Sequence, residues 1–121
     1  DAAVDGAIMC KFRNAGQTCV CANRIYVQAG VYDEFAEKLA AKVGAMSMGD
    51  ALAGAVDFGP LINPKATEKV HAHIADAKAK GATVILGDTE TGLSGNFITP
   101  TIVTGATKDM AFLSYDISML D

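Results

Sequence analysis

The spacing of apolar residues near the start of the chain predicts an amphipathic helix. Val4, Ile8 and Phe12 recur every four residues, so they share one face of such a helix. Gly16 is expected to close it, because glycine readily adopts the left-handed conformation that follows many helix ends. Residues 24–28, Arg-Ile-Tyr-Val-Gln, then predict a strand, with Ala29-Gly30 as the turn that follows it.

Two longer helices are predicted further along. The first spans about 31–46, with acidic residues near its start and lysines near its end, an order that complements the helix dipole. Its buried stripe comprises Val31, Phe35, Leu39, Val43 and Met46. The second starts at Asn63-Pro64, since asparagine caps helices and proline fits the first turn. Val70, Ile74 and Ala77 mark its inner face, and Lys80-Gly81 ends it.

The second half of the chain adds the predicted strands. Thr83–Leu86 and Phe97–Val103 have strand composition and flank a glycine-rich turn. Pro100 has no N–H to donate to a ladder, so the later strand should lie at an edge or carry a bulge. Strands that alternate with helices indicate an α/β fold with an open, largely parallel sheet flanked by helices.

Composition narrows the classes of partner and compartment. The chain has 121 residues, half of them hydrophobic, which suits one compact domain. Its formal net charge of -4 at pH 7 gives no electrostatic reason to expect nucleic acid or an anionic membrane as partner. No apolar run approaches the roughly 20 residues that span a bilayer. Three cysteines, two of them separated by one residue, do not form a disulfide framework and favour a cytoplasmic setting.

Residues 12–24, Phe-Arg-Asn-Ala-Gly-Gln-Thr-Cys-Val-Cys-Ala-Asn-Arg, carry the candidate chemistry. They place Cys19 in a tight turn after the first helix. Backbone amides directed out of such a turn would favour the nucleophilic thiolate and would bind the oxygen of a tetrahedral intermediate. Arg13 and Arg24 would also favour the thiolate if they face it. On these residues alone, a single cysteine is more often a small core residue than a nucleophile.

The same segment resembles the cysteine active-site motif of the aldehyde dehydrogenase superfamily. The resemblance rests on Phe12, Gly16, Gln17 and Cys19 at these spacings. It continues in the family's order through 24–27, 59–62 and 96–102 and covers roughly residues 1–110. It implies that Cys19 attacks an aldehyde carbonyl, that a hydride passes to NAD or NADP, and that water hydrolyses the resulting thioester.

Within the superfamily, residues 11–23 most resemble the succinate-semialdehyde dehydrogenases. Arg13 matches a position that lines the substrate tunnel, which implies a small aldehyde with a terminal carboxylate that the guanidinium can grip. The alternative is an arginine solvated at the helix end. Cys21 is typical of this branch and would be able to close a reversible disulfide with Cys19. Its alternative is a buried small residue, and Cys10 is interpreted as packing.

The resemblance also implies parts that these residues do not contain. No glycine-rich dinucleotide motif occurs, so residues 1–121 are expected to be part of a catalytic domain, without the cofactor-binding domain. The family's general-base glutamate and asparagine oxyanion donor are expected outside the chain as well. Residues 111–121 do not match the family's ribose-binding Glu-Glu-x-Phe-Gly-Pro segment, for which Asp116 is only a distant substitute. We therefore expect the fragment alone to be inactive. The resemblance also implies that the full-length protein is a homo-oligomer.

Three other functions stay open on the sequence. The first is a truncated, non-catalytic module kept for assembly or binding. The second is a small thiol-redox protein that uses Cys19 and Cys21, although the C-x-x-C spacing is lacking. The third is a zinc site formed by these cysteines with His71 and His73. It is disfavoured, because side chains two apart on a helix point about 200° away from each other.

Overall fold

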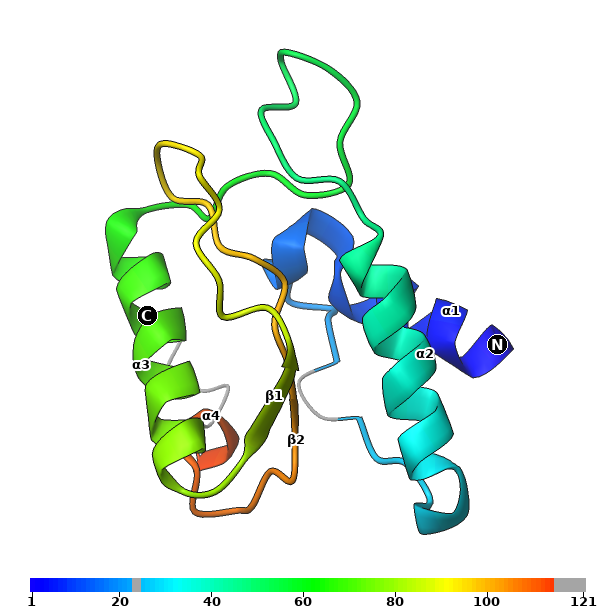
Figure 1. Ribbon diagram of the computed structural model, residues 1–121. Helices are drawn as coiled ribbons and strands as arrows, with labels where there is room; N and C mark the ends of the chain where they lie inside the picture. Colours follow the sequence, from blue (N-terminus) through cyan, green and yellow to red (C-terminus); the bar gives the residue numbers. More distant parts are fainter. Residues whose placement is uncertain (23–24, 115–121) are drawn as a thin grey trace.

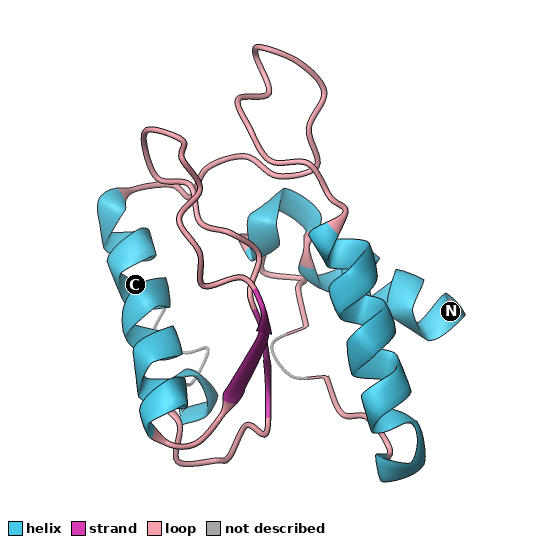
Figure 2. Cartoon of the chain, viewed as in Figure 1, coloured by secondary structure: helices cyan, strands magenta, loops and turns pink. Residues whose placement is uncertain are grey.

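The computed structural model describes residues 1–22 and 25–114. A pair of short strands lies between two groups of helices (Figures 1 and 2). The elements in order are α1 (Ala2–Lys11), η1 (Arg13–Gly16), η2 (Ala29–Val31), α2 (Tyr32–Gly44), α3 (Pro64–Ala79), β1 (Thr83–Leu86), β2 (Ile102–Thr104) and α4 (Ala111–Ser114). Helices α1 and α2 lie on one side of the strands, and α3 and α4 lie on the other. Within the described ranges, no helix has both the length and the apolar character needed to cross a bilayer.

The core lies where α1 and α2 meet β2. It is built from Val4, Leu39, Val43 and Ile102, with Ala7, Ile8, Phe12, Phe35 and Met46 packed against it. The predicted apolar stripes of the first two helices are therefore confirmed, with one exception. Val31 is 50% exposed, because it belongs to the short turn η2 that precedes α2 rather than to the helix itself.

Helix α3 follows the sequence prediction from end to end. Asn63 caps it, since its side-chain oxygen accepts a hydrogen bond from the Ala66 N–H at 2.9 Å. Ile74 and Ala77 are buried on its inner face. The helix ends at Ala79 with Lys80 as its C-cap, and Gly81 takes a positive φ of 91° beyond it.

The two strands form an antiparallel pair with an irregularity between Val84 and Leu86. β1 occupies the predicted range, whereas β2 takes up only the end of the predicted 97–103. Gly87, at φ 83°, explains the shortening: the chain passes so close to it that an added Cβ would lie 2.3 Å from the Pro100 carbonyl oxygen. That approach occupies residues 100–101 and leaves the ladder to residues 102–104.

The mixture of helices and strands agrees with the predicted α/β class, but these two strands are not parallel. Residues 87–101 return the chain without a helix, and a parallel pair needs a longer crossover. Residues 25–28 are not a strand in this chain, because no described segment pairs with them in a ladder. Arg24, the first residue of that predicted strand, lies outside the described residues.

Candidate functional site

A left-handed turn follows α1 and leads to Cys19. Asn14, Ala15 and Gly16 take φ values of 54°, 53° and 79° in succession. A right-handed helix cannot continue through these residues. The prediction that Gly16 closes the helix is therefore wrong, because α1 ends at Lys11, five residues earlier. Glycine takes such a conformation freely, but alanine does so at a cost of roughly 1–2 kcal/mol. Backbone strain of this kind gathers at functional sites.

Local hydrogen bonds hold this segment, which we call the cysteine turn (residues 13–21). The Gln17 N–H donates to the Asn14 carbonyl at 3.0 Å. In return, the Asn14 side-chain amide donates to the Gln17 carbonyl at 3.2 Å. A Cβ at Gly16 would come within 3.3 Å of the Lys11 carbonyl oxygen, so a side chain there would be crowded as well as strained. The turn thus depends on asparagine and glycine at these positions.

Cys19 lies on the outer side of the cysteine turn. Its side chain is exposed, so it is not a small core residue in this chain. Its backbone N–H has no acceptor among the described residues, whereas two residues later the Cys21 N–H donates to the Thr18 carbonyl at 3.1 Å. A thiol and a free amide therefore occur together on one exposed residue.

Cys21 has a different environment. It is 8% exposed, and its sulfur lies 2.8 Å from the Thr18 hydroxyl oxygen. The thiol also donates to the Lys11 carbonyl at 3.6 Å. These contacts fit the alternative of a buried small residue. Cys10, by contrast, is exposed and lines a surface groove, so its interpretation as a packing residue is wrong for this chain.

Arg13 opens the cysteine turn and is exposed to solvent. Its guanidinium forms no ion pair or hydrogen bond with any other residue in 1–22 or 25–114. A guanidinium with five N–H donors and no internal partner is available to an external carboxylate. Its position before Cys19 is fixed by the same left-handed turn.

The structure brings together three segments that the sequence related only by their order. The Gln17 side chain accepts a hydrogen bond from the Ile62 N–H at 2.9 Å and donates to the Pro60 carbonyl at 3.5 Å. The intervening Leu61 N–H donates to the Asn96 carbonyl at 2.8 Å. The cysteine turn, residues 59–62 and the start of 96–102 are therefore joined by hydrogen bonds.

Sequence reasoning assigned no role to Gln17, although it belongs to the matched motif. The sequence did offer a signal for it: Gln17 is a polar residue of the motif, and residues 59–62 and 96–102 match the same family. A second contact strengthens the same junction: the rings of Phe12 and Phe58 pack edge to face, with centroids 5.8 Å apart. Phe58 is 3% exposed, so the loop that bears the Gln17 partners is anchored in the interior.

The histidines do not join this site. Burial, with a smaller contribution from Lys69, holds the pKa of His73 below its ordinary value. Among the described residues, no three His, Cys, Asp or Glu side chains gather in a way that would hold a metal ion. The structure gives the zinc alternative no support.

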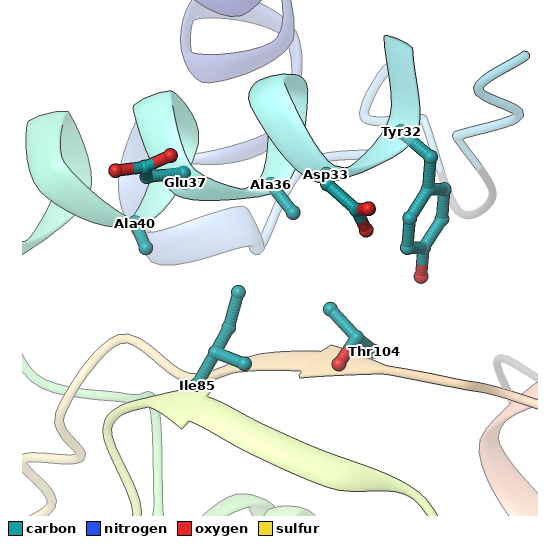
Figure 3. Close-up of a pocket in the computed structure, with 7 residues that line it drawn as sticks. All are labelled: Tyr32, Asp33, Ala36, Glu37, Ala40, Ile85 and Thr104. Carbon is teal, nitrogen blue, oxygen red and sulfur yellow. The ribbon is translucent and has the colours of Figure 1, made fainter. Parts of the chain in front are cut away.

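The surface grooves also lie elsewhere. One, of about 400 Å³, separates α2 from the strands: Tyr32, Asp33 and Glu37 face Ile85 and Thr104 across it (Figure 3). A second, of about 470 Å³, lies beside residues 25–31. Neither is lined by Cys19 or Arg13. Cys19 and Arg13 are instead exposed at the surface of the described chain.

Comparisons with known proteins agree on one family. The model of the Aldehyde dehydrogenase family matches residues 1–117. A probable NADP(+) succinate-semialdehyde dehydrogenase from Sinorhizobium fredii is 58% identical over 91% of this chain, which covers 22% of that protein. A glutarate-semialdehyde dehydrogenase from Pseudomonas aeruginosa is 53% identical over 96% of this chain, which covers 24% of it.

A solved structure shows the same similarity in three dimensions. The crystal structure of succinate-semialdehyde dehydrogenase from Burkholderia pseudomallei matches 93% of this chain with a TM-score of 0.89 and 50% sequence identity. Only 23% of that longer chain is covered. The chain thus spans less than a quarter of the relatives it matches.

Proposed function

The chain belongs to the aldehyde dehydrogenase family, and from this we propose that it is the segment that supplies the nucleophile, Cys19, to an NAD(P)-dependent aldehyde dehydrogenase. The observation that carries the proposal is the exposed thiol of Cys19 within the strained cysteine turn. The substrate that we propose is succinate semialdehyde, which the complete enzyme would oxidise to succinate.

The first step uses groups of this chain. The Cys19 thiolate attacks the aldehyde carbon, a C–S bond forms, and the carbonyl oxygen becomes an oxyanion. The Cys19 N–H, which has no acceptor among the described residues, is free to donate to that oxyanion. The two groups belong to one residue, so the cysteine turn sets both at once.

The cofactor is proposed to bind outside this chain. Neither groove is lined by the glycine-rich turn of a phosphate-binding loop, and residues 1–22 and 25–114 contain no dinucleotide motif. NAD or NADP held by other segments would accept the hydride in the complete enzyme. The thioester would then be hydrolysed by water with a base from those segments, since the family's glutamate is absent here.

Arg13 is proposed to select aldehydes with a distal carboxylate. Its guanidinium is exposed and has no carboxylate partner in the described part of the chain. The two relatives described above are named for succinate and glutarate semialdehydes, and both compounds carry such a carboxylate. A bidentate pair would orient the substrate from the end opposite to Cys19.

The remaining architecture is proposed for the complete enzyme. Residues 25–28 are extended at Gln28 and pair with no strand in 1–22 or 25–114, which suits a strand of a larger, largely parallel sheet. The family resemblance supports a homo-oligomer, and the free cysteines support a cytoplasmic location.

A second candidate is a thiol switch between Cys19 and Cys21. It is favoured by their separation of a single residue. The Cys21 thiol is buried and hydrogen-bonded to Thr18, so this disulfide requires the Thr18 contact to break first. An easily reduced, conditional bond is therefore proposed rather than a structural one.

Limited labelling with iodoacetamide, followed by peptide mass mapping, tests the nucleophile. Cys10 is a matched control within the chain, because it is exposed like Cys19 but lies on a regular helix. We expect Cys19 to be modified first, since thiolate character and not exposure alone sets the rate. Equal or faster modification of Cys10 would contradict the assignment.

A further inference from the structure

Gln17 is the residue that ties the cysteine turn to the rest of the fold. Its Oε1 accepts from the Ile62 N–H at 2.9 Å, while its Nε2 donates to the carbonyls of Asn14 at 3.2 Å and Pro60 at 3.5 Å. We propose that Gln17 is a positioning residue for Cys19, which holds the Cys19 thiol and amide in the orientation that acylation requires. The inference rests on the proposed role of Cys19 as nucleophile.

The turn needs such a brace because its own conformation is costly. Ala15 is held at φ 53°, and the hydrogen bonds between Asn14 and Gln17 are internal to the turn. Internal bonds move with a segment that relaxes, so they cannot fix its direction. The bonds from Gln17 to residues 60–62 join it to a segment 43 and 45 residues away.

The other side of the brace is itself fixed. Between the two Gln17 contacts, the Leu61 N–H donates to the Asn96 carbonyl at 2.8 Å. Just before them, Phe58 is buried and packs against the Phe12 ring. The segment 58–62 is therefore held independently of Gln17 and can serve as the fixed reference for the cysteine turn.

Only an amide side chain suits these contacts. The three bonds use an acceptor and a donor at one terminus. Gln17→Glu keeps the acceptor for Ile62 but turns a carboxylate oxygen toward two carbonyls that need a donor. Gln17→Leu has similar size and removes all three bonds. Gln17→Glu therefore removes part of the hydrogen bonding of Gln17, and Gln17→Leu removes all of it.

Two reactions of Cys19 separate its orientation from its basic reactivity. With p-nitrophenyl acetate, the thiolate attacks the ester carbonyl, a C–S bond forms, the C–O bond breaks and p-nitrophenolate leaves. The intermediate carries an oxyanion that the Cys19 amide must meet. With iodoacetamide, the thiolate displaces iodide from a saturated carbon, and no oxyanion forms. The ratio of the two rate constants thus reports the placement of thiol and amide.

The experiment measures this ratio in the full 121-residue chain and in Gln17→Leu, Gln17→Glu and Gln28→Leu. Gln28 is an exposed glutamine whose side chain has no hydrogen bond among the described residues, so it is the control. We expect Gln17→Leu to lower acylation by about tenfold or more relative to alkylation, since a misplaced oxyanion donor costs on that order. Gln17→Glu should lie between, and Gln28→Leu should match the unmodified chain. An unchanged ratio in Gln17→Leu would overturn the proposal.

Hydrogen exchange at the Ile62 amide tests the brace without any reaction of Cys19. Exchange should accelerate in Gln17→Leu, in which the acceptor is lost, and circular dichroism should show the helices retained. Unchanged exchange would show that no brace exists and would overturn the proposal. If the unmodified chain is alkylated but never acylated, the proposed function fails, and the Ile62 exchange still decides whether Gln17 holds the turn.

Discussion

Helix α3 and the cysteine turn fix their backbones in opposite ways. In α3 each residue has an ordinary helical conformation, and Asn63 caps the first turn through a hydrogen bond to Ala66. In the cysteine turn, Asn14, Ala15 and Gly16 hold positive φ values, and the distant residues 60–62 supply part of the support. The first region is stable by its local composition, whereas the second is kept in place by contacts from elsewhere.

The difference indicates where each region bears function. A helix whose hydrogen bonds are internal makes a scaffold, and strain supported from outside can present a thiol and an amide in one direction. The burial of Ile74 and Ala77 serves packing, while the exposure of Cys19 and Arg13 leaves them open to a ligand. A substitution in one region is therefore expected to spare the other.

The largest effect is expected from Arg13→Phe in the complete enzyme. The loss of a charge-assisted pair with the substrate carboxylate should cost roughly 1.5–3 kcal/mol of transition-state stabilisation for succinate semialdehyde. The corresponding kcat/KM should fall by about tenfold or more. Butanal, of similar length but uncharged, should be oxidised nearly as before. Steady-state kinetics with both aldehydes decide the matter. Equal losses for the two substrates would make Arg13 a structural residue of the turn.

The same substitution in the two regions should have opposite signs. Ala72→Gly, at an exposed position within α3, should lower the free energy of unfolding by about 1 kcal/mol. Ala15→Gly should raise the free energy of unfolding by about 0.5–1 kcal/mol. Glycine removes the cost of the positive φ, and the larger conformational entropy of the unfolded chain offsets part of this stabilisation. Urea unfolding of both variants measures the two values. Destabilisation by Ala15→Gly would show that the turn is not strained.

A smaller, pH-dependent effect is expected at the C-terminal side of α3. The Lys80 ammonium, followed by the Ala111 N–H, holds the pKa of the Asp76 carboxyl below its ordinary value. Because the folded-state pKa is the lower one, this contribution is complete above the unfolded pKa of about 4 and is lost as pH falls through the folded value.

Unfolding experiments from about pH 5 downward should therefore show a smaller acid-induced loss of stability in Asp76→Asn than in the unmodified chain. Asp33→Asn on α2, whose carboxylate has no ion pair within the described residues, serves as the matched control. An acid profile identical in Asp76→Asn and the unmodified chain would remove Asp76 from the account.

The regions also differ in how far the sequence predicts them. Asn63-Pro64 and Lys80-Gly81 determine the ends of α3 through their own preferences, and Thr83–Leu86 has the composition of a strand. All three predictions are confirmed, because each depends on residues next to one another. Within the cysteine turn, the motif identifies Cys19 and Gly16, and Gly16 does take a positive φ.

What the sequence did not predict depends on contacts that are far apart in the chain. Alanine has no preference for a positive φ, so the conformation of Ala15 is imposed by its surroundings. The bonds of Gln17 to Pro60 and Ile62 cannot be read from local spacing. Residues 25–28 have the composition of a strand but lack a partner strand among the described residues, because pairing depends on a second segment and not on propensity alone.

The central claim is that this chain holds the nucleophile of an aldehyde dehydrogenase without its cofactor site. It is tested most directly by the purified 121-residue chain with p-nitrophenyl acetate and, separately, with succinate semialdehyde and NADP+. We predict a slow burst of p-nitrophenolate of up to one equivalent, with the acetyl group on Cys19, and no production of NADPH. The burst should be absent in Cys19→Ser and retained in Cys10→Ser. Acetyl transfer to another residue, or clear NADPH production, would contradict the account.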